Sequence, residues 1–141
     1  MDSLEVRPAN FRRKPLHPDI TEEAIKQLVD AFYAKVRKDQ RLGPIFNGTI
    51  GDKWDVHLPK MYDFWSSVTR MTGRYKGKPM VQHMKLKQVE QGDFDIWLSL
   101  FRETARDLFA DEVANIFIAR AEMIAKSLQL GMCYLPVEKP Q

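Results

Sequence analysis

Apolar residues recur at helical spacing along most of this chain, and no segment shows the alternation typical of a strand. Four segments carry this pattern, at about 19–42, 52–71, 93–108 and 111–131. Their predicted inward stripes are Ile25, Leu28, Val29, Phe32 and Val36; Trp54, Leu58, Met61, Phe64, Trp65 and Val68; Phe94, Trp97, Leu98, Phe101, Ala105 and Leu108; and Val113, Ile116, Phe117, Met123, Ile124 and Leu128. The sequence therefore predicts an all-α domain of four principal helices.

The ends of the first helix are predicted from residues with special backbone preferences. Asp19 is a candidate N-cap because Glu22 follows three residues later, as in a capping box. Gly43-Pro44 is expected to end the segment. Phe46 then falls in a short connection closed by Asn47-Gly48, which places one large aromatic residue between two helices.

The later helices carry further signals at their ends. Pro59 lies inside the second segment, where it removes a hydrogen bond, so the helix is expected either to begin near Leu58 or to bend there. Asp93 is expected to cap the third helix. Asp111-Glu112 places two carboxylates at the start of the fourth, where they complement the helix dipole.

The composition limits the size and the setting of the protein. With 141 residues, of which 44% are hydrophobic, one domain can bury its own core. A single cysteine, Cys133, excludes an intrachain disulfide and a cysteine-based metal cluster, which indicates a reducing compartment. The chain shows no secretory pattern at its start and no apolar run long enough to span a bilayer. We therefore expect a cytoplasmic protein without a membrane partner.

The first 18 residues differ from the rest. Pro8, Pro15 and Pro18 stand among charged residues, so residues 1–18 are expected to form an extended or disordered basic lead-in. A basic tail can meet nucleic acid or a membrane, but no basic face interleaved with aromatic residues follows it. A solvated tail is therefore the favoured interpretation, and no nucleic-acid partner is expected.

His83 is the residue on which a functional interpretation depends. Pro79 fits the first position of a short fifth helix, which places His83 one turn inside it, between Met80 and Leu86. A neutral imidazole on an apolar stripe is either a core histidine or a metal ligand whose other ring nitrogen is held by a nearby acceptor. This stretch alone leaves both interpretations open.

A second histidine, His57, lies on the apolar stripe of the second segment. Two inward histidines on different helices can sandwich a flat cofactor such as haem, which needs an imidazole ligand and an apolar slot. The inward residues available for such a slot are Phe46, Met61, Phe64, Met80, Trp97 and Met123, although such a set is more often plain core. A zinc site is less favoured because the apolar stripes supply neither thiolates nor carboxylates, and nothing around Cys133 supports a nucleophile.

Several motifs, in order, resemble the group III truncated haemoglobins between about Thr21 and Tyr134. The matching stretches are Phe32-Tyr33-Ala34-Lys35-Val36-Arg37, Leu42-Gly43-Pro44-Ile45-Phe46, His57-Leu58-Pro59-Lys60-Met61-Tyr62-Asp63-Phe64-Trp65, the positions Tyr75, Gly77, Pro79, His83 and Leu86, and Ile96-Trp97-Leu98-Ser99-Leu100-Phe101. Pro59 is part of the stretch that resembles the family motif. The resemblance implies a compact two-over-two helical globin domain at 19–134, followed by a tail at 135–141.

The resemblance also implies a cofactor and its site. It implies b-type haem with His83 as the proximal iron ligand, and Tyr33, His57 and Trp97 around the distal site. The expected haem contacts are Phe46, Met61, Phe64, Tyr75, Met80 and Leu86, and the candidate propionate partners are Lys60, Arg74, Tyr75 and Lys76. The role of His57 stays open, because it can face the ligand, swing out as a gate, or bind the iron.

Two functions follow from that site, and a third does not need it. The first is reversible binding of O₂, nitric oxide or another small diatomic ligand, to which the Tyr33 hydroxyl and the Trp97 indole can donate hydrogen bonds. The second is a haem enzyme that consumes nitric oxide or peroxide with electrons from an external reductase, since this chain contains no reductase domain. The third is a helical interaction module without a cofactor, if the resemblance misleads.

Overall fold

The computed structural model describes residues 14–77 and 89–131, and within these ranges it contains five α-helices and no strand. The helices are α1 (Glu22–Lys38), α2 (Leu42–Ile50), α3 (Trp54–Arg70), α5 (Gln91–Leu108) and α6 (Asp111–Gln129). The predicted all-α class and the four principal helices are confirmed. The predicted fifth helix around His83 lies outside the described residues. None of the described helices is long and apolar enough to cross a membrane.

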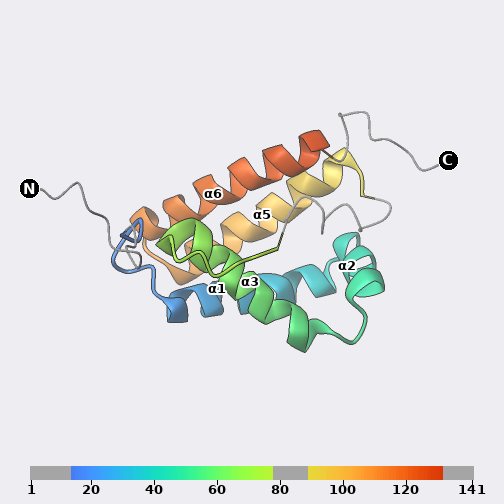
Figure 1. The fold of residues 1–141 in the computed structure, drawn as a ribbon. Helices are drawn as coiled ribbons and strands as arrows, with labels where there is room; N and C mark the ends of the chain where they lie inside the picture. The colour runs from blue at the N-terminus through green and yellow to red at the C-terminus, as the bar shows by residue number, and fades with distance from the viewer. Residues whose placement is uncertain (1–13, 78–88, 132–141) are drawn as a thin grey trace, which may run out of the picture.

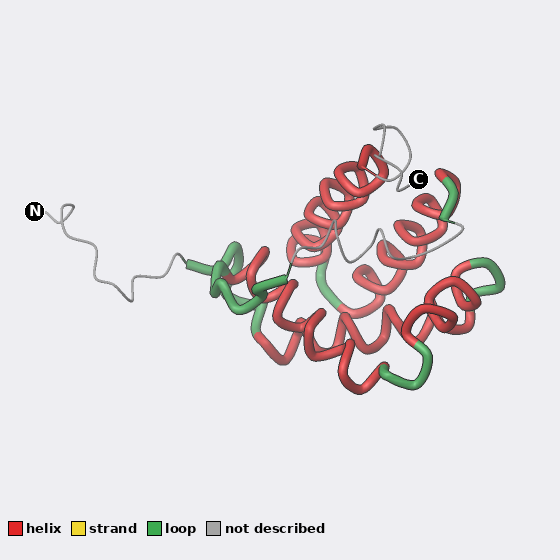
Figure 2. The backbone as a smooth tube through the Cα atoms, turned by 45° about the vertical axis from the view of Figure 1, so that its right-hand side comes forward, coloured by secondary structure: helices red, strands yellow, loops and turns green. Residues whose placement is uncertain are grey.

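The helices form two layers (Figure 1). The pair α1 and α3 lies against the pair α5 and α6, and Figure 2 shows the same two pairs from a second direction. The closest pairing is between α5 and α6, and α1 touches α2, α3 and α5. The apolar stripe of α1 is deeply buried between these neighbours, with Ile25, Leu28 and Val36 fully inaccessible. This is the two-over-two arrangement expected from the sequence.

The start of α1 differs from the prediction. The N-cap is Thr21, whose hydroxyl oxygen accepts a hydrogen bond from the Ala24 N–H at 3.1 Å. Asp19 lies two residues earlier, where its own N–H donates to His17 Nδ1. Ile20 between them is fully buried. Burial of Ile20 fixes the chain entry, and the first free backbone N–H groups then fall within reach of Thr21 instead of Asp19.

The segment after α1 is a helix and not the connection that the sequence predicted. α1 ends at Lys38, and Gly43, Pro44 and Phe46 all belong to α2. Pro44 lies in the first turn, where its missing N–H costs no intrahelical hydrogen bond. A Cβ on Gly43 would lie 2.7 Å from the carbonyl oxygen of Arg37. Gly43 is therefore the residue that lets α2 pack tightly against the end of α1.

Pro59 lies within α3, which runs from Trp54 to Arg70, so the helix does not begin near Leu58.

The N-cap of α5 is Glu90, and Asp93 is the N3 residue, the third residue of the helix; the two side chains form a capping box. The prediction that Asp93 is the N-cap was wrong, because the N-cap lies three residues earlier, at Glu90. Helix α6 begins with Asp111 and Glu112, as predicted.

Candidate functional site

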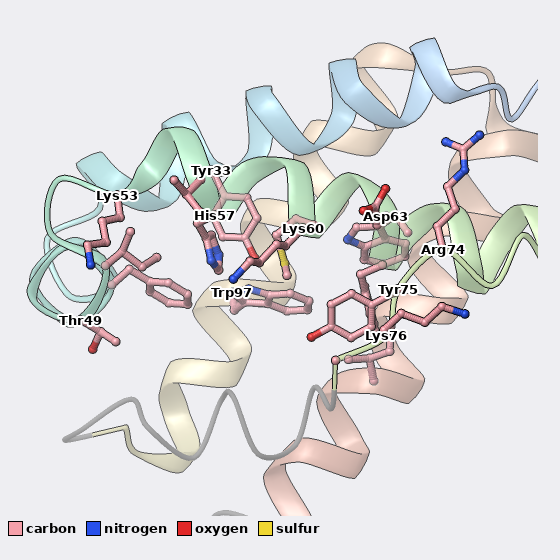
Figure 3. Close-up of a pocket in the computed structure, with 18 residues that line it drawn as sticks. Tyr33, Thr49, Lys53, His57, Lys60, Asp63, Arg74, Tyr75, Lys76 and Trp97 are labelled. Carbon is pink, nitrogen blue, oxygen red and sulfur yellow. The ribbon is translucent and has the colours of Figure 1, made fainter.

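A cavity of about 670 Å³ lies between the two helix layers (Figure 3). Helices α1, α2, α3, α5 and α6 and the segment at 74–77 all contribute to its walls. The lining residues are Tyr33, Phe46, Thr49, Ile50, Lys53, Val56, His57, Lys60, Met61, Asp63, Phe64, Trp65, Arg74, Tyr75, Lys76, Gly77, Trp97 and Ile124. Its volume lies within the range of about 300–1,000 Å³ that small-molecule and cofactor sites occupy.

The three predicted distal residues come together at this cavity from three different helices. Tyr33 comes from α1, His57 from α3 and Trp97 from α5, and Figure 3 shows all three in one region of the cavity. The rings of Tyr33 and His57 meet edge to face, with centroids 5.9 Å apart and an interplanar angle of 88°. The Nε2 atom of His57 is buried. Three side chains that can make hydrogen bonds thus share one largely apolar space.

Tyr33 is buried, with 4% of its surface exposed. Its ring packs against Phe32 and Phe46, with centroid separations of 4.9 and 6.2 Å. Desolvation by burial raises the pKa of the Tyr33 hydroxyl above its ordinary range. The hydroxyl therefore stays protonated in neutral solution and is available as a hydrogen-bond donor.

Trp97 is fixed by aromatic neighbours. Its indole stacks on Phe101, with centroids 5.7 Å apart and an angle of 14° between the rings. Phe101 stacks in turn on Trp65, at 5.1 Å and 19°, and Phe32 meets the edge of Trp97 at 5.3 Å. The position of Trp97 therefore depends on a stack that joins α5 to α3, and not on α5 alone.

The predicted haem contacts are divided by the limits of the described residues. Phe46, Met61, Phe64 and Tyr75 all line the cavity. Met80, Leu86 and the predicted iron ligand His83 lie outside the described residues.

Met123, which the sequence also suggested for the apolar slot, is 61% exposed and does not line the cavity. Its neighbour Ile124 lines it instead. Successive side chains of a helix point about 100° apart. A predicted apolar face that includes one residue too many therefore includes a side chain that faces solvent.

The lining residues that were not predicted to line the site include Trp65 and Lys53. Trp65 follows Met61 by one helical turn, so helical spacing was a signal that could have identified it. No comparable signal existed for Lys53, because it precedes α3 and its position depends on the path of the chain between α2 and α3.

The walls of the cavity also carry cationic side chains. Figure 3 shows Lys53 toward one end of the cavity, Lys60 near its middle, and Arg74 and Lys76 toward the other end. Arg74 forms an ion pair with Glu22 of α1 at 3.2 Å. The backbone of Tyr75 is held by its N–H, which donates to Ser67 Oγ at 2.8 Å. Desolvation raises the pKa of the Tyr75 hydroxyl, which keeps it a neutral donor.

The described residues fit a haem, the group that the resemblance implies. A haem is a flat apolar ring with two carboxylates on one edge, so it needs apolar walls and cations at one side. The apolar walls include Phe46, Met61 and Phe64. The cations toward one end are Arg74 and Lys76, and Lys60 is a further cation near the middle of the cavity. Within residues 14–77 and 89–131, no group of three or more histidine, cysteine, aspartate or glutamate side chains is placed to hold a bare metal ion.

Comparisons with known proteins show which family this chain is similar to. The family model described as bacterial-like globin matches residues 20–129. The chain is 41% identical over 113 residues to the group 3 truncated hemoglobin ctb of Campylobacter jejuni, a match that covers 78% of this chain and 89% of that protein.

Solved structures of truncated hemoglobins have a similar fold. A crystal structure of a group III truncated hemoglobin from Campylobacter jejuni superposes with a TM-score of 0.78 at 36% identity, and the match covers 89% of this chain and 100% of the other. A group II truncated hemoglobin from Bacillus anthracis superposes with a TM-score of 0.66 at 21% identity, with 91% and 96% covered. At 21% identity, the similarity to the Bacillus anthracis protein supports the fold alone and not a shared function.

Proposed function

Because the chain belongs to the bacterial-like globin family, and within it to the group III truncated haemoglobins, we propose that it binds b-type haem through His83 and reversibly binds O₂ or another diatomic ligand. The family is one of haem-binding globins that take small diatomic ligands. The distal residues that we assign to this chain are Tyr33, His57 and Trp97. When bound, the haem iron supplies an open coordination position for the ligand.

The observation that carries the proposal is the meeting of Tyr33, His57 and Trp97 at one apolar cavity. A neutral phenol is a donor and an acceptor, and an indole N–H is a donor only. A ligand that gains partial negative charge on binding is stabilised by such donors, and more strongly in a site that excludes water. The apolar side chains of Phe46, Met61 and Phe64 line the same cavity and would limit the water that can reach a bound ligand.

The edge of the cavity has a separate role in the proposal. Lys60, Arg74 and Lys76 are the cations that would hold the two carboxylates of the haem, and the Tyr75 hydroxyl would donate to one of them. The ion pair with Glu22 limits how far Arg74 can move. Charge pairing at this edge orients the group, whereas the apolar walls provide most of the binding free energy.

A visible absorption spectrum of the purified protein, reconstituted with haem, tests the proposal. We expect a strong Soret band, and a reduced ligand-free state that is mainly five-coordinate and binds O₂ and carbon monoxide reversibly. A chain that gives no Soret band after reconstitution would contradict the proposal entirely. A six-coordinate reduced spectrum that disappears in His57→Ala would make the protein a bis-histidine electron-transfer or sensor candidate.

The same preparation separates binding from catalysis. Reduced protein with bound O₂ is mixed with nitric oxide, or oxidised protein with peroxide, in the presence of a chemical electron donor. A binding protein is expected to react once and stop. Repeated turnover at a constant rate would instead support a haem enzyme that depends on an external reductase.

A further inference from the structure

Trp54, the first residue of α3, contacts two of the three distal side chains, Tyr33 and His57, without lining the cavity itself. Its ring centroid lies 5.6 Å from that of Tyr33 and 5.5 Å from that of His57, and it meets the imidazole at 90°. Since Tyr33 and His57 also touch each other, the three rings form a closed triangle. Trp54 is buried, with 5% of its surface exposed, and it contacts the other two rings without lining the cavity.

The indole of Trp54 is itself held on its edge and on its face. Its Nε1–H donates to Asn47 Oδ1 at 3.0 Å, and the Asn47 amide donates to the backbone carbonyl of Arg37 at 3.3 Å. The Arg37 guanidinium covers the ring at 4.7 Å from its centroid. Residues from α1 and α2 thus hold the side chain of Trp54 on α3 in one orientation.

We propose that Trp54, held by Asn47, is a positioning residue that sets the orientation of His57 and Tyr33 toward the ligand cavity. This inference rests on the proposed function, because it assigns a role at the same site. An imidazole has few rotamers, and a large ring in T-shaped contact with it removes those that would occupy the same space. Removing the indole opens space behind His57 and lets its ring move away from the cavity.

Trp54→Leu tests the inference in the haem-bound protein. Carbon monoxide is the probe, because its infrared stretching band reports the polar groups beside it. We expect one narrow band in the wild type, several or broadened bands in Trp54→Leu, and O₂ dissociation changed by about fivefold or more, well outside the scatter of additive mutations. The same band and rate in variant and wild type would overturn the proposal.

A variant that lacks the polar groups of Tyr33 and His57 shows whether Trp54 acts through these two residues. In a Tyr33→Phe/His57→Ala background, adding Trp54→Leu should leave the O₂ dissociation rate within about 1.5-fold, because the groups that it positions are gone. An undiminished effect there would mean that Trp54 acts by general loosening, and would refute the inference. Phe109→Leu is the matched control for lost packing, because Phe109 stacks on Phe117 at 5.3 Å and does not line the cavity.

Two milder variants keep the inference testable if Trp54→Leu does not fold. Trp54→Phe retains a ring against His57, so the single carbon monoxide band should be kept. Asn47→Leu is close in size to the native residue but removes the acceptor, so the band should broaden although Trp54 is present. A broadened band in Trp54→Phe together with a native band in Asn47→Leu would contradict the assigned roles.

Failure of the proposed function gives a different result. If the wild type binds no haem, the ring signals of His57 in the NMR spectrum of the haem-free chain replace the infrared probe. Sharp single signals in the wild type and multiple signals in Trp54→Leu would support positioning by Trp54. Identical signals in the two proteins would reject it.

Discussion

Asp93, in the first turn of α5, accepts two hydrogen bonds from the guanidinium of Arg41, which is 52 residues away in the sequence. The Nε and Nη2 atoms of Arg41 lie 2.7 and 2.9 Å from the two carboxylate oxygens. The same carboxylate accepts the Glu90 N–H at 2.8 Å. Arg41 immediately precedes α2, so this contact joins the start of α2 to the start of α5. Trp97 lies one turn further along α5.

The Asp93 contact predicts a pH-dependent stability. Hydrogen bonds from Arg41 are the main cause that holds the pKa of Asp93 below its usual range. A depressed pKa stabilises the fold above the unfolded value of about 3.9, and this stabilisation is lost as the pH falls through the lower folded value. We expect Asp93→Asn to lower the free energy of unfolding by about 1–2 kcal/mol at pH 7, a figure discounted because Arg41 is 40% exposed.

Urea unfolding of wild type and Asp93→Asn at several pH values measures this effect. The difference between the two proteins should be constant above about pH 5 and shrink below pH 4. Asp107→Asn is the matched control on the same helix, because Asp107 is 69% exposed and its ion pair with Lys35 is 3.8 Å long. A difference for Asp93→Asn that does not change with pH would show that the pair is not its source.

Gly43→Ala should destabilise the protein because there is no room for a methyl group. An added Cβ would meet the Arg37 carbonyl oxygen at 2.7 Å and its carbon at 3.3 Å, and backbone atoms cannot rotate away. We expect a loss of about 1–3 kcal/mol in the free energy of unfolding, the usual cost of overpacking. Gly48→Ala, in the same helix, is the control: nothing lies within 4 Å of its Cβ. It should be neutral or add up to about 1 kcal/mol. Equal stability of the two variants would refute the close approach.

His83→Gly should abolish or greatly weaken haem binding, because the family motif assigns the proximal imidazole to this residue. Free imidazole added to the variant should restore part of the Soret band by filling the space of the lost side chain. His17→Gly is a suitable control, since His17 interacts with the Asp19 N–H and with Glu112 and does not line the cavity. An unchanged five-coordinate spectrum in His83→Gly would assign the iron ligand to another residue, His57 being the first to examine.

Trp97→Phe should speed O₂ release while preserving the ring stack on Phe101. The lost hydrogen bond to a partly charged acceptor is worth about 1.5–3 kcal/mol, or roughly a ten- to hundredfold change in equilibrium. Most of this change should appear in the dissociation rate measured by stopped flow, because the bond forms after the ligand has entered. Carbon monoxide, a weaker acceptor, should respond much less.

The comparison of gases separates hydrogen bonding from pocket size. A larger pocket would change both ligands alike, whereas a lost donor changes mainly O₂. A Trp97→Phe rate within about twofold of wild type, under 0.5 kcal/mol, would remove Trp97 from the donor role. Tyr33→Phe would then be expected to show the large effect.

Local periodicity in the sequence determined most of the helical architecture. The spacing of Ile25, Leu28 and Val36 predicted a buried face, and all three are fully buried. Such predictions succeed because a helix turns by a fixed angle per residue, so which residues share a face depends only on their spacing. The same rule predicted that His57 and Trp97 lie on inward stripes, and both line the cavity. Tyr33, which also lines it, was named by the family resemblance.

Contacts between distant segments decided the rest. The close packing of α2 on the end of α1 depends on the missing side chain of Gly43 beside Arg37, and the role of Asp93 depends on Arg41. Met123 faces solvent and Ile124 faces the cavity because α6 packs at one rotation on α5, which periodicity fixes only to about one residue. Trp54 and His57 are three residues apart on α3, so their contact follows from helical spacing. The contacts of Trp54 with Tyr33 and Asn47 exist only where α1, α2 and α3 meet, since no local rule states which face of one helix touches another.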